Sequence, residues 1–333
     1  MRFPLRQTIT IARYISRQKR GGTEKFPLVL MLEPLHACNL SCSGCGRIRE
    51  YRDTLSTMVP IEKCLAAIDE CGAPVVSICG GEPLLYPQIG ELVDETLKRG
   101  RVVYLCTNGQ FLDKKLSTFQ PHPYFNINVH VDGPQKIHDA IVEKEGAYAK
   151  AINGIRLALK EGFTVCTNTT IYRQTTVQDI KTLIDELSLI GVNGILISPS
   201  YGYEDVENQS VFLTRQEIFE KFSSLGDAVR GKRLWSTPLY MDFLTGKRSF
   251  DCTPWGNVTY NIKGWKAPCY LMTDGHFDAF AEFMQKVDWN RYGPGRDRRC
   301  EHCMVHSGFE ATVALKTSTS LKDTLRMARW TLL

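Results

Sequence analysis

The stretch that decides the fold reads FPLVLMLEPLHACNLSCSGC and covers residues 26–45. Its apolar run at 27–33 has the length and composition of a buried strand. Directly after it come Cys38, Cys42 and Cys45, a C-x3-C-x2-C triplet on a loop. Structural zinc usually takes four ligands from paired C-x2-C hooks, whereas three thiolates suit a [4Fe–4S] cluster with one open iron. The triplet therefore predicts such a cluster at the end of the first strand; the alternatives are zinc and reduced bystander cysteines.

Outward from this stretch, strand-like and helix-like runs alternate to about residue 230, which indicates parallel βα units. The expected strands are 27–33, 75–79, 102–107, 125–132, 164–171 and 194–198. The expected helices lie near 60–71, 88–99, 111–118, 147–161, 175–190 and 214–229. Six units make an incomplete (β/α) barrel or an open doubly wound sheet. The first strand is followed by no GxGxxG, which disfavours a dinucleotide-binding fold.

Composition excludes several classes of protein. The 333 residues are 43% apolar and 23% charged, with a net charge of +5, as in an ordinary globular protein. No basic stripe interleaved with aromatic residues suggests nucleic acid. The sequence shows no signal peptide and no run of about 18 apolar residues that would span a bilayer. Twelve cysteines without an export signal indicate metal binding in a reducing compartment, so we expect a cytoplasmic protein.

Three regions are expected: a basic helix at 1–25, the barrel at 26–230 and a cysteine-rich module with a tail at 231–333. In the first, Leu5, Ile9 and Ala12, with Ile15 or Ser16, follow helical spacing. The flanking basic residues are Arg2, Arg6, Arg13, Arg17, Lys19 and Arg20. Such a helix suits the surface of an anionic membrane, where it would make peripheral contact. The alternative is a helix that caps the domain.

The strand expected at 125–132 alternates strictly between polar and apolar residues. Because side chains alternate faces along a strand, its apolar residues would meet the helices and its polar residues would line an interior cavity. A packed barrel interior is normally apolar, so the pattern favours a reaction chamber over a structural network. The polar residues are Asn126, Asn128, His130 and Asp132.

The chain resembles the radical SAM (S-adenosylmethionine) superfamily, which shares the cysteine triplet and a partial (β/α)6 barrel. The second strand ends on Gly80-Gly81-Glu82-Pro83, similar to the GGEP segment of that superfamily, and the third ends on Thr107-Asn108-Gly109. The resemblance implies that the open iron binds SAM and cleaves it to a carbon radical. It also implies that backbone groups and the carboxylate of the GGEP segment bind the methionine ammonium, with Asn108 nearby.

The resemblance also implies that the interiors of the fourth and fifth strands contact the ribose and carboxylate of SAM. The candidates are His130, Asp132 and Asn168. One position departs from the pattern: the residue before the last cysteine is often aromatic and packs near adenine, and here it is Gly44. The residue that packs against adenine is therefore unassigned.

A second cysteine group lies in the last third of the chain. It is similar to the shortened SPASM, or twitch, modules of radical SAM enzymes, which hold one auxiliary iron–sulfur cluster. Four thiolates would also satisfy tetrahedral zinc, so zinc is the alternative. The group comprises Cys252, Cys269, Cys300 and Cys303. The remaining Cys64, Cys71, Cys79 and Cys166 are expected to pack as small apolar residues.

Longer segments resemble adenosyl hopene transferases, among them 26–48, SICGGEPLLYP at 77–87 and CTPWGNVTYNIKGWKAPCYL at 252–271. The resemblance implies addition of the 5′-deoxyadenosyl group to the alkene of hopene (diploptene) to give adenosylhopane in hopanoid biosynthesis. It also implies an electron donor such as flavodoxin or ferredoxin. The alternatives are hydrogen abstraction from a peptide or small molecule, as twitch-bearing relatives perform, and a non-catalytic iron–sulfur protein.

Addition to this alkene leaves a tertiary carbon radical that needs a hydrogen atom. A thiol donates one readily, because its S–H bond is weaker than a tertiary C–H bond. Cys106 lies on the third strand two residues before Asn108, so it faces the same side, and Tyr104 lies deeper on that side. Cys106 is therefore our candidate hydrogen donor; the alternative is a small core residue.

Overall fold

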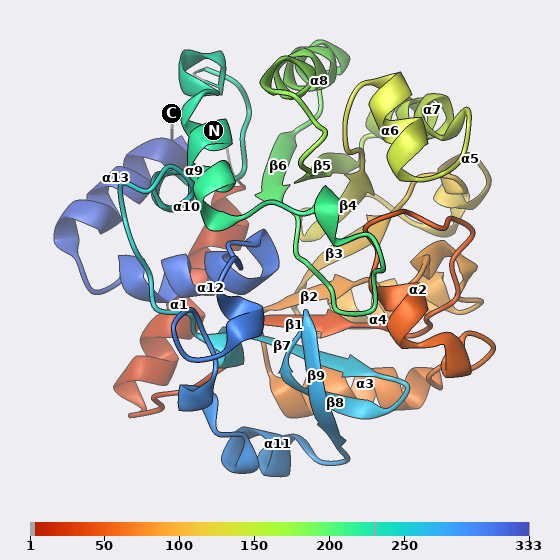
Figure 1. Cartoon of the computed structure of the whole chain (residues 1–333). Coiled ribbons are helices and arrows are strands. Elements are labelled where there is room, and N and C mark those ends of the chain that lie inside the picture. The colour runs from red at the N-terminus through yellow and green to blue at the C-terminus, as the bar shows by residue number, and fades with distance from the viewer. Residues whose placement is uncertain (1–3, 230, 333) are drawn as a thin grey trace.

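The computed structural model describes residues 4–229 and 231–332. At its centre is one nine-stranded sheet in the order β6-β5-β4-β3-β2-β1-β7-β8-β9 (Figure 1). The first six strands and β7 run parallel, while β8 and β9 are antiparallel to their neighbours. The strands are β1 Val29–Leu32, β2 Val75–Ile78, β3 Val102–Thr107, β4 Phe125–His130, β5 Thr164–Ile171, β6 Gly194–Pro199, β7 Asn257–Asn261, β8 Gly264–Cys269 and β9 Met272–Phe277.

Strands β1–β6 and their helices form an incomplete (β/α)6 barrel, which confirms the predicted fold class. All six expected strands are found within two residues of their expected ends. The main helices are α3 Ile61–Cys71, α4 Ile89–Lys98, α5 Leu112–Lys115, α7 Ala147–Lys160, α8 Val177–Ile190 and α9 Arg215–Ser223, and two short ones that the pattern did not predict are α2 Arg47–Glu50 and α6 Gln135–Ile141. Local signals set their ends: α8 begins with a capping box from Thr176 to Asp179 and stops at left-handed Gly191.

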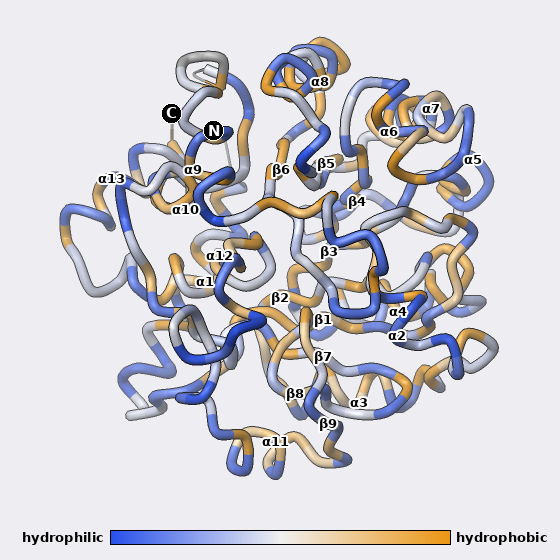
Figure 2. Tube along the Cα trace, viewed as in Figure 1, coloured by the Kyte–Doolittle hydropathy of each residue, from blue (hydrophilic) through white to orange (hydrophobic). Residues whose placement is uncertain are grey.

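The core lies between the sheet and these helices. Strands β1 and β2, near the centre of Figure 2, are among its apolar segments. Leu30, Val103, Leu105 and Ile127 have no exposed surface. Burial of such side chains against the helices supplies most of the stabilisation. Cys64, Cys71, Cys79 and Cys166 are buried, as expected of small apolar residues.

The last third of the chain extends the same sheet. Strand β7 pairs in parallel with β1, with Val29 opposite Asn257, and β8 and β9 continue outward from it. The pattern of the sequence did not predict these strands. The C-terminal helices are α10 Pro238–Leu244, α11 Phe280–Lys286, α12 His306–Thr317 and α13 Leu321–Leu332. The region boundaries at 25 and 230 remain predictions, and the sheet is continuous across the second.

Helix α1, Leu5–Arg20, lies at the amino ends of the barrel strands. Gln7 is 1% exposed, and its Nε2 donates to Asn126 Oδ1 (3.1 Å) and to the carbonyl of Pro123 (3.0 Å). The helix therefore caps the barrel, as the alternative interpretation expected, while Leu5 and Ile9 remain exposed. Arg2 lies outside the described residues. No helix within the described ranges is long and apolar enough to cross a membrane.

Candidate active site at the carboxyl ends of the strands

The three cysteines of the triplet lie on the loop after β1, and all three are half-buried. The side chain of Arg49 shapes this loop by donating from Nη1 to the carbonyls of Cys42 (3.0 Å) and Cys45 (2.5 Å). Burial, followed by the charges of Glu82 and Cys45, raises the pKa of Cys38 to about 11. Burial and the neighbouring thiols raise the pKa of Cys42 as well. Thiolates in this loop therefore need a positively charged partner among them.

The surroundings of Cys38 fit a thiolate bound to an iron–sulfur cluster. Its sulfur accepts a hydrogen bond from the backbone of Leu40 and another from Asn108 Nδ2 (3.7 Å). Hydrogen bonds to the sulfurs are one of the ways a protein tunes such a cluster. Across the described residues no three His, Cys, Asp or Glu side chains are grouped so that they could hold one metal ion. A cubane binds each thiolate through a different iron, so its ligands need not share one centre.

The glycines of the GGEP segment are required by the cysteine loop itself. A Cβ on Gly80, whose φ is +108°, would lie 2.2 Å from the carbonyl oxygen of Leu35, and one on Gly81 would lie 2.0 Å from that of Ala37. The backbone N–H of Gly81 instead donates to the Leu35 carbonyl (3.1 Å). Only glycine permits this approach, which holds residues 80–83 beside the loop that carries Cys38.

The carboxylate of Glu82 joins the ends of β2 and β3. It is fully buried and accepts from Thr107 Oγ1 (2.7 Å) and from the backbone N–H groups of Asn108 (2.8 Å) and Leu84 (3.0 Å). Burial outweighs these donors and raises its pKa to about 7. The contact with the methionine ammonium expected of Glu82 and of the backbone through Pro83 remains a prediction. The carboxylate of Glu82 already accepts hydrogen bonds from Thr107, Asn108 and Leu84.

His130 and Asp132 form a pair at the end of β4, with 2.5 Å between Nε2 and Oδ2. Asp132 is fully buried and also accepts from the backbone of Thr170 (2.7 Å). Burial lowers the pKa of His130, but the contact with Asp132 more than offsets this, so the pKa is raised. Asn168 stands opposite His130 on β5 and is half-buried. These side chains share the interior face, as predicted, and their role toward SAM remains a prediction.

The interior face of β3 carries Tyr104 and Cys106, both more exposed than the fully buried Val103 and Leu105. The sulfur of Cys106 lies 3.2 Å from Ser77 Oγ and accepts from Asn128 Nδ2 (3.5 Å). Burial raises the pKa of Cys106, so this group is a neutral thiol at neutral pH.

Asn126, in contrast, does not line the chamber. It is fully buried at the amino end of β4, where its Nδ2 donates to the carbonyl of Val103 (3.2 Å) and Gln7 of α1 contacts its amide. The prediction of one polar chamber face was therefore wrong for its first residue. The reason is that a distant helix supplies its partner, which no local pattern reveals.

Tyr172, immediately after β5, explains the glycine before the last cysteine. A Cβ on Gly44 would lie 2.3 Å from Cε1 of Tyr172, so the ring occupies the space that a side chain at 44 would fill. In the same way the ring of Tyr203 covers Gly46. Two aromatic rings therefore pack against the cluster loop from a different part of the chain. The sequence analysis missed both, since neither belongs to a motif.

The four C-terminal cysteines line one pocket together with Tyr201, Met272 and Phe309. Three of the four sulfurs accept hydrogen bonds from backbone N–H groups: Cys269 from Leu271 and Met272, Cys300 from Gly293, and Cys303 from Val305. Such N–H donors around thiols suit a bound iron–sulfur cluster. The structure therefore brings together the predicted set of Cys252, Cys269, Cys300 and Cys303.

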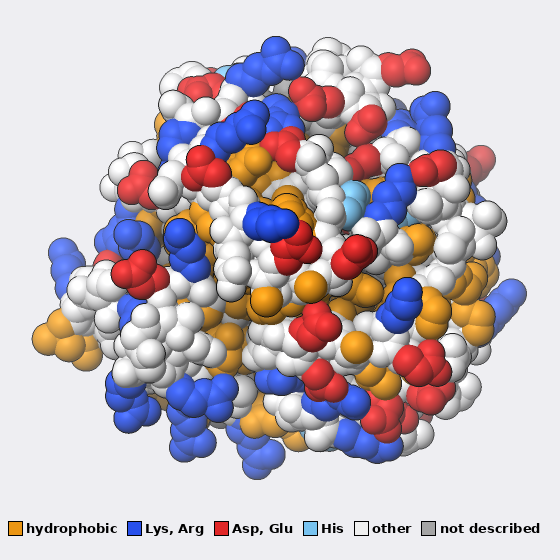
Figure 3. Space-filling view, turned by 90° about the horizontal axis from the view of Figure 1, so that it is seen from below, with side chains coloured by type: hydrophobic (Ala, Val, Ile, Leu, Met, Phe, Trp, Pro, Cys, Tyr) orange, Lys and Arg blue, Asp and Glu red, His pale blue; other side chains and the backbone are white. Residues whose placement is uncertain are grey.

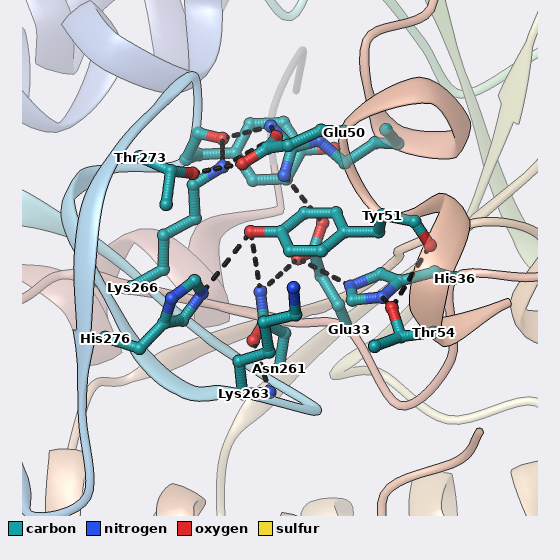
Figure 4. Close-up of polar contacts among 12 residues, drawn as sticks. Glu33, His36, Glu50, Tyr51, Thr54, Asn261, Lys263, Lys266, Thr273 and His276 are labelled. Carbon is teal, nitrogen blue, oxygen red and sulfur yellow. Dashed lines mark hydrogen bonds and ion pairs between the residues drawn. The ribbon is translucent and has the colours of Figure 1, made fainter.

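A buried polar network connects the cluster loop to the C-terminal strands (Figure 4). At its centre Tyr51 stacks on His36, with ring centroids 3.9 Å apart, and its hydroxyl accepts from Asn261 (3.0 Å) and faces His276 (3.4 Å). Glu33 of the loop contacts His36 (3.5 Å) and Asn261 (3.3 Å). The network thereby fixes the loop against β7 and β9.

Two buried cations balance the acids of this network. Arg47 contacts Glu33 (3.6 Å), Glu50 (3.3 Å) and the carbonyl of Tyr270 (2.5 Å). Lys266 contacts Glu50 (3.2 Å). Burial would raise the pKa of Glu33, yet Arg47, His36 and Lys266 lower it to about 2. Burial and Arg47 lower the pKa of Lys266 to about 8. The network is built from single residues scattered along the chain, so no sequence motif predicted it.

A three-cysteine loop at the carboxyl end of a parallel (β/α)6 sheet, next to a GGEP segment, defines a radical SAM enzyme. Residues 32–187 match the model of the radical SAM superfamily, and residues 195–327 match a domain of unknown function, DUF3463. Residues 32–187 therefore belong to the radical SAM superfamily, whose members are enzymes that use a [4Fe–4S] cluster and SAM.

Its relatives include the antilisterial bacteriocin subtilosin biosynthesis protein AlbA of Bacillus subtilis, 22% identical over 90% of this chain and 70% of that protein. The Fe-coproporphyrin III synthase of Methanosarcina barkeri is 29% identical over 45% of this chain. Among solved structures, Streptococcus suis SuiB bound to its precursor peptide SuiA has a TM-score of 0.66 at 14% identity and covers 93% of this chain and 77% of that one.

Several curated relatives are covered only in part by this chain. The chain spans 38% of the Fe-coproporphyrin III synthase and 52% of an AdoMet-dependent heme synthase from the same organism. None of these relatives is described as acting on hopene. The superfamily resemblance is therefore confirmed, while the resemblance to adenosyl hopene transferases is not shown by the relatives.

Proposed function

We propose that this enzyme joins the 5′-deoxyadenosyl group to the terminal alkene of hopene. When bound at Cys38, Cys42 and Cys45, the cluster and SAM supply a 5′-deoxyadenosyl radical on one-electron reduction. The single observation that carries the proposal is the position of the Cys106 thiol on the interior face of β3, 3.2 Å from Ser77 Oγ. The addition reaction leaves a substrate radical that must receive a hydrogen atom from a donor. Abstraction of hydrogen from a substrate needs no such donor for the adenosyl group.

Sequence supports the same reaction. The resemblance to adenosyl hopene transferases covers about 300 residues and extends beyond the generic motifs, for example through CTPWGNVTYNIKGWKAPCYL at 252–271. In the proposed reaction the 5′-carbon bonds to the exposed alkene carbon and leaves a tertiary carbon radical. Cys106 donates its hydrogen atom and becomes a thiyl radical. One electron from a donor of the flavodoxin or ferredoxin class and one proton from solvent then restore the thiol.

The other interior residues hold SAM and position it. His130, oriented by Asp132, and Asn168 face the space where the ribose and carboxylate of SAM are expected. The GGEP backbone, held by the cysteine loop, offers groups for the methionine ammonium.

A second candidate is abstraction of hydrogen from a peptide. The relatives and fold neighbours favour it: AlbA is described as a bacteriocin biosynthesis protein, the Mycobacterium tuberculosis protein MftC as a mycofactocin maturase, and SuiB was solved with a precursor peptide. The two candidates differ in what happens to the adenosyl group. Abstraction releases 5′-deoxyadenosine, and addition keeps the group in the product.

The test is a product analysis of the anaerobic, reconstituted protein with SAM, a reductant and hopene. We expect an adenosine-bearing lipid by mass spectrometry, and none from a variant with alanine at Cys38, Cys42 and Cys45. Release of 5′-deoxyadenosine without adenosylated lipid would reject the addition reaction and leave the peptide reaction. SAM cleavage by the triple variant would reject the site itself.

A further inference from the structure

Helix α13 presents its apolar side to solvent. Leu321, Leu325 and Leu332 are 76%, 62% and 56% exposed, and Ala328 beside them is exposed too. With 3.6 residues a turn, these positions fall within an arc of about 60° on one side of the helix. Asp323 on the opposite side is buried, and so is Thr331, about a quarter turn from the stripe. A helix that packs on a core normally shows the reverse arrangement.

Ion pairs and the packing of Met327 against the core, rather than the leucines, hold α13 on the protein. Arg248 makes a two-pronged contact with Asp323, with Nη1–Oδ2 at 2.7 Å and Nη2–Oδ1 at 2.9 Å. Arg326 pairs with Asp242 of α10 through the same geometry. These contacts fix the rotation of the helix, so the leucine stripe points outward because the polar side is anchored.

The charge around the stripe favours an anionic partner. Lys322 and Arg329 are exposed next to the leucines, and the sole acid among residues 321–332 is Asp323, which faces inward and is neutralised by Arg248. A second copy of the chain would bring this basic patch against itself, since a twofold interface pairs identical surfaces. An anionic lipid surface accepts both the leucines and the cations.

Helix α1 adds to the same region. Lys19 at its end donates to Ser318 (2.6 Å), just before α13, and Leu5 and Ile9 on α1 are 37% and 39% exposed. Figure 3 shows Lys and Arg side chains along the left edge of the molecule, the side of α1 and α13 in Figure 1, where hydrophobic atoms also project.

We propose that α13 is a membrane-docking helix, whose Leu321, Leu325 and Leu332 enter the headgroup region of an anionic bilayer while Lys322 and Arg329 contact lipid phosphates. The proposal does not depend on the substrate. It predicts that the protein lies on a membrane whether it modifies hopene or a peptide.

The test is flotation of the reconstituted protein with phosphatidylcholine vesicles that do or do not contain phosphatidylglycerol. Wild type should float with the anionic vesicles. The double variant Leu321→Glu and Leu325→Glu should lose this binding. The variant Lys322→Gln with Arg329→Gln should bind anionic vesicles about fivefold more weakly for each charge removed. The matched control is Leu189→Glu on α8. This leucine is 88% exposed, and the proposal gives it no contact with the membrane.

Two results would overturn the proposal. One is that the leucine double variant floats with anionic vesicles as well as wild type and the Leu189→Glu control do. The other is a wild-type dimer that the leucine variant converts to a monomer in light scattering, with no binding of vesicles, which would make this face a contact between copies. Absorbance of the reconstituted cluster and the thermal midpoint verify that each variant is folded.

Discussion

Gly44 has no side chain because the ring of Tyr172 fills that space. We expect Gly44→Ala to destabilise the protein by about 1–3 kcal/mol, because overpacking a buried site shifts its neighbours. In a Tyr172→Ala background the same change should cost clearly less, since the clash is gone. Anaerobic urea unfolding measures both. Gly275→Ala, where a Cβ meets nothing within 4 Å, is the control. Additive energies in the double variant would contradict the packing account.

Cys106 gives the second prediction at this scale. Cys106→Ala should still cleave SAM but yield less adenosylated lipid, with unsaturated or other radical-derived by-products in its place. The control is Cys166→Ala, because Cys166 also contacts Asn128, through its Oδ1 at 3.4 Å, yet is fully buried. Mass spectrometry of the lipid products decides: a normal yield from Cys106→Ala would make solvent or another side chain the hydrogen donor.

What the sequence predicts about single residues depends on how local the reason is. Alternation along β3 and β4 correctly assigned Cys106 and Asn128 to the interior, because a strand fixes which side each residue faces. Asn126 was wrongly assigned to the chamber, and the glycine at position 44 was left unexplained. Their partners, Gln7 and Tyr172 respectively, lie more than a hundred residues away in the sequence. Such pairs exist only after the chain has folded.

At the scale of elements, the loop after β1 depends on Arg47, which is buried between Glu33 and Glu50. Arg47→Met should cost about 3–5 kcal/mol, because it leaves a buried carboxylate without a cation. The double variant Arg47→Met with Glu33→Leu should be more stable than the sum of the single effects predicts. The control is Arg52→Met, at an exposed position nearby. Equal unfolding energies for Arg47→Met and Arg52→Met would contradict the role of the network.

Glu310 on α12 makes a prediction about pH. It accepts from the N–H (3.0 Å) and the hydroxyl (3.0 Å) of Thr237, which begins α10, and burial raises its pKa from 4.5 to about 7. Between these values the folded protein keeps a proton that the unfolded chain has released. Stability therefore falls as pH rises from about 4.5 to about 7, by an amount of the order of 3 kcal/mol. Glu310→Gln should remove this share of the pH dependence in unfolding measured at pH 5 and pH 8. An unchanged slope would contradict it.

The elements of the barrel followed from the sequence because βα alternation is a local, repeated signal. Strands β7–β9 did not, since short strands in a turn-rich stretch carry little periodicity and β7 pairs with β1, a strand more than two hundred residues away. The cysteines that they help to position were nevertheless recognised as a metal-ligand set, because the spacing of cysteines along the sequence can be recognised even where secondary-structure patterns are weak.

At the scale of the whole molecule, two cysteine groups imply two metal centres. Replacing Cys252, Cys269, Cys300 and Cys303 by alanine should remove about four irons per chain and lower the thermal midpoint, because bound metal contributes folding free energy. The matching variant at the first triplet should lose a similar amount of iron and all SAM cleavage. Wild type with one zinc and a single cluster's worth of iron would make the second site a zinc site.

The parallel pairing of β1 with β7 joins segments from nearly opposite ends of the chain. During synthesis, β1 has β2 on one side and an open edge on the other until residues 257–261 leave the ribosome. An unpaired strand edge invites association with other chains, and contacts this distant in sequence form slowly. The nascent enzyme is thus most vulnerable after its catalytic barrel is complete and before its last strands arrive. The first cluster has a complete set of cysteines during that interval, whereas the second site must wait for the end of translation.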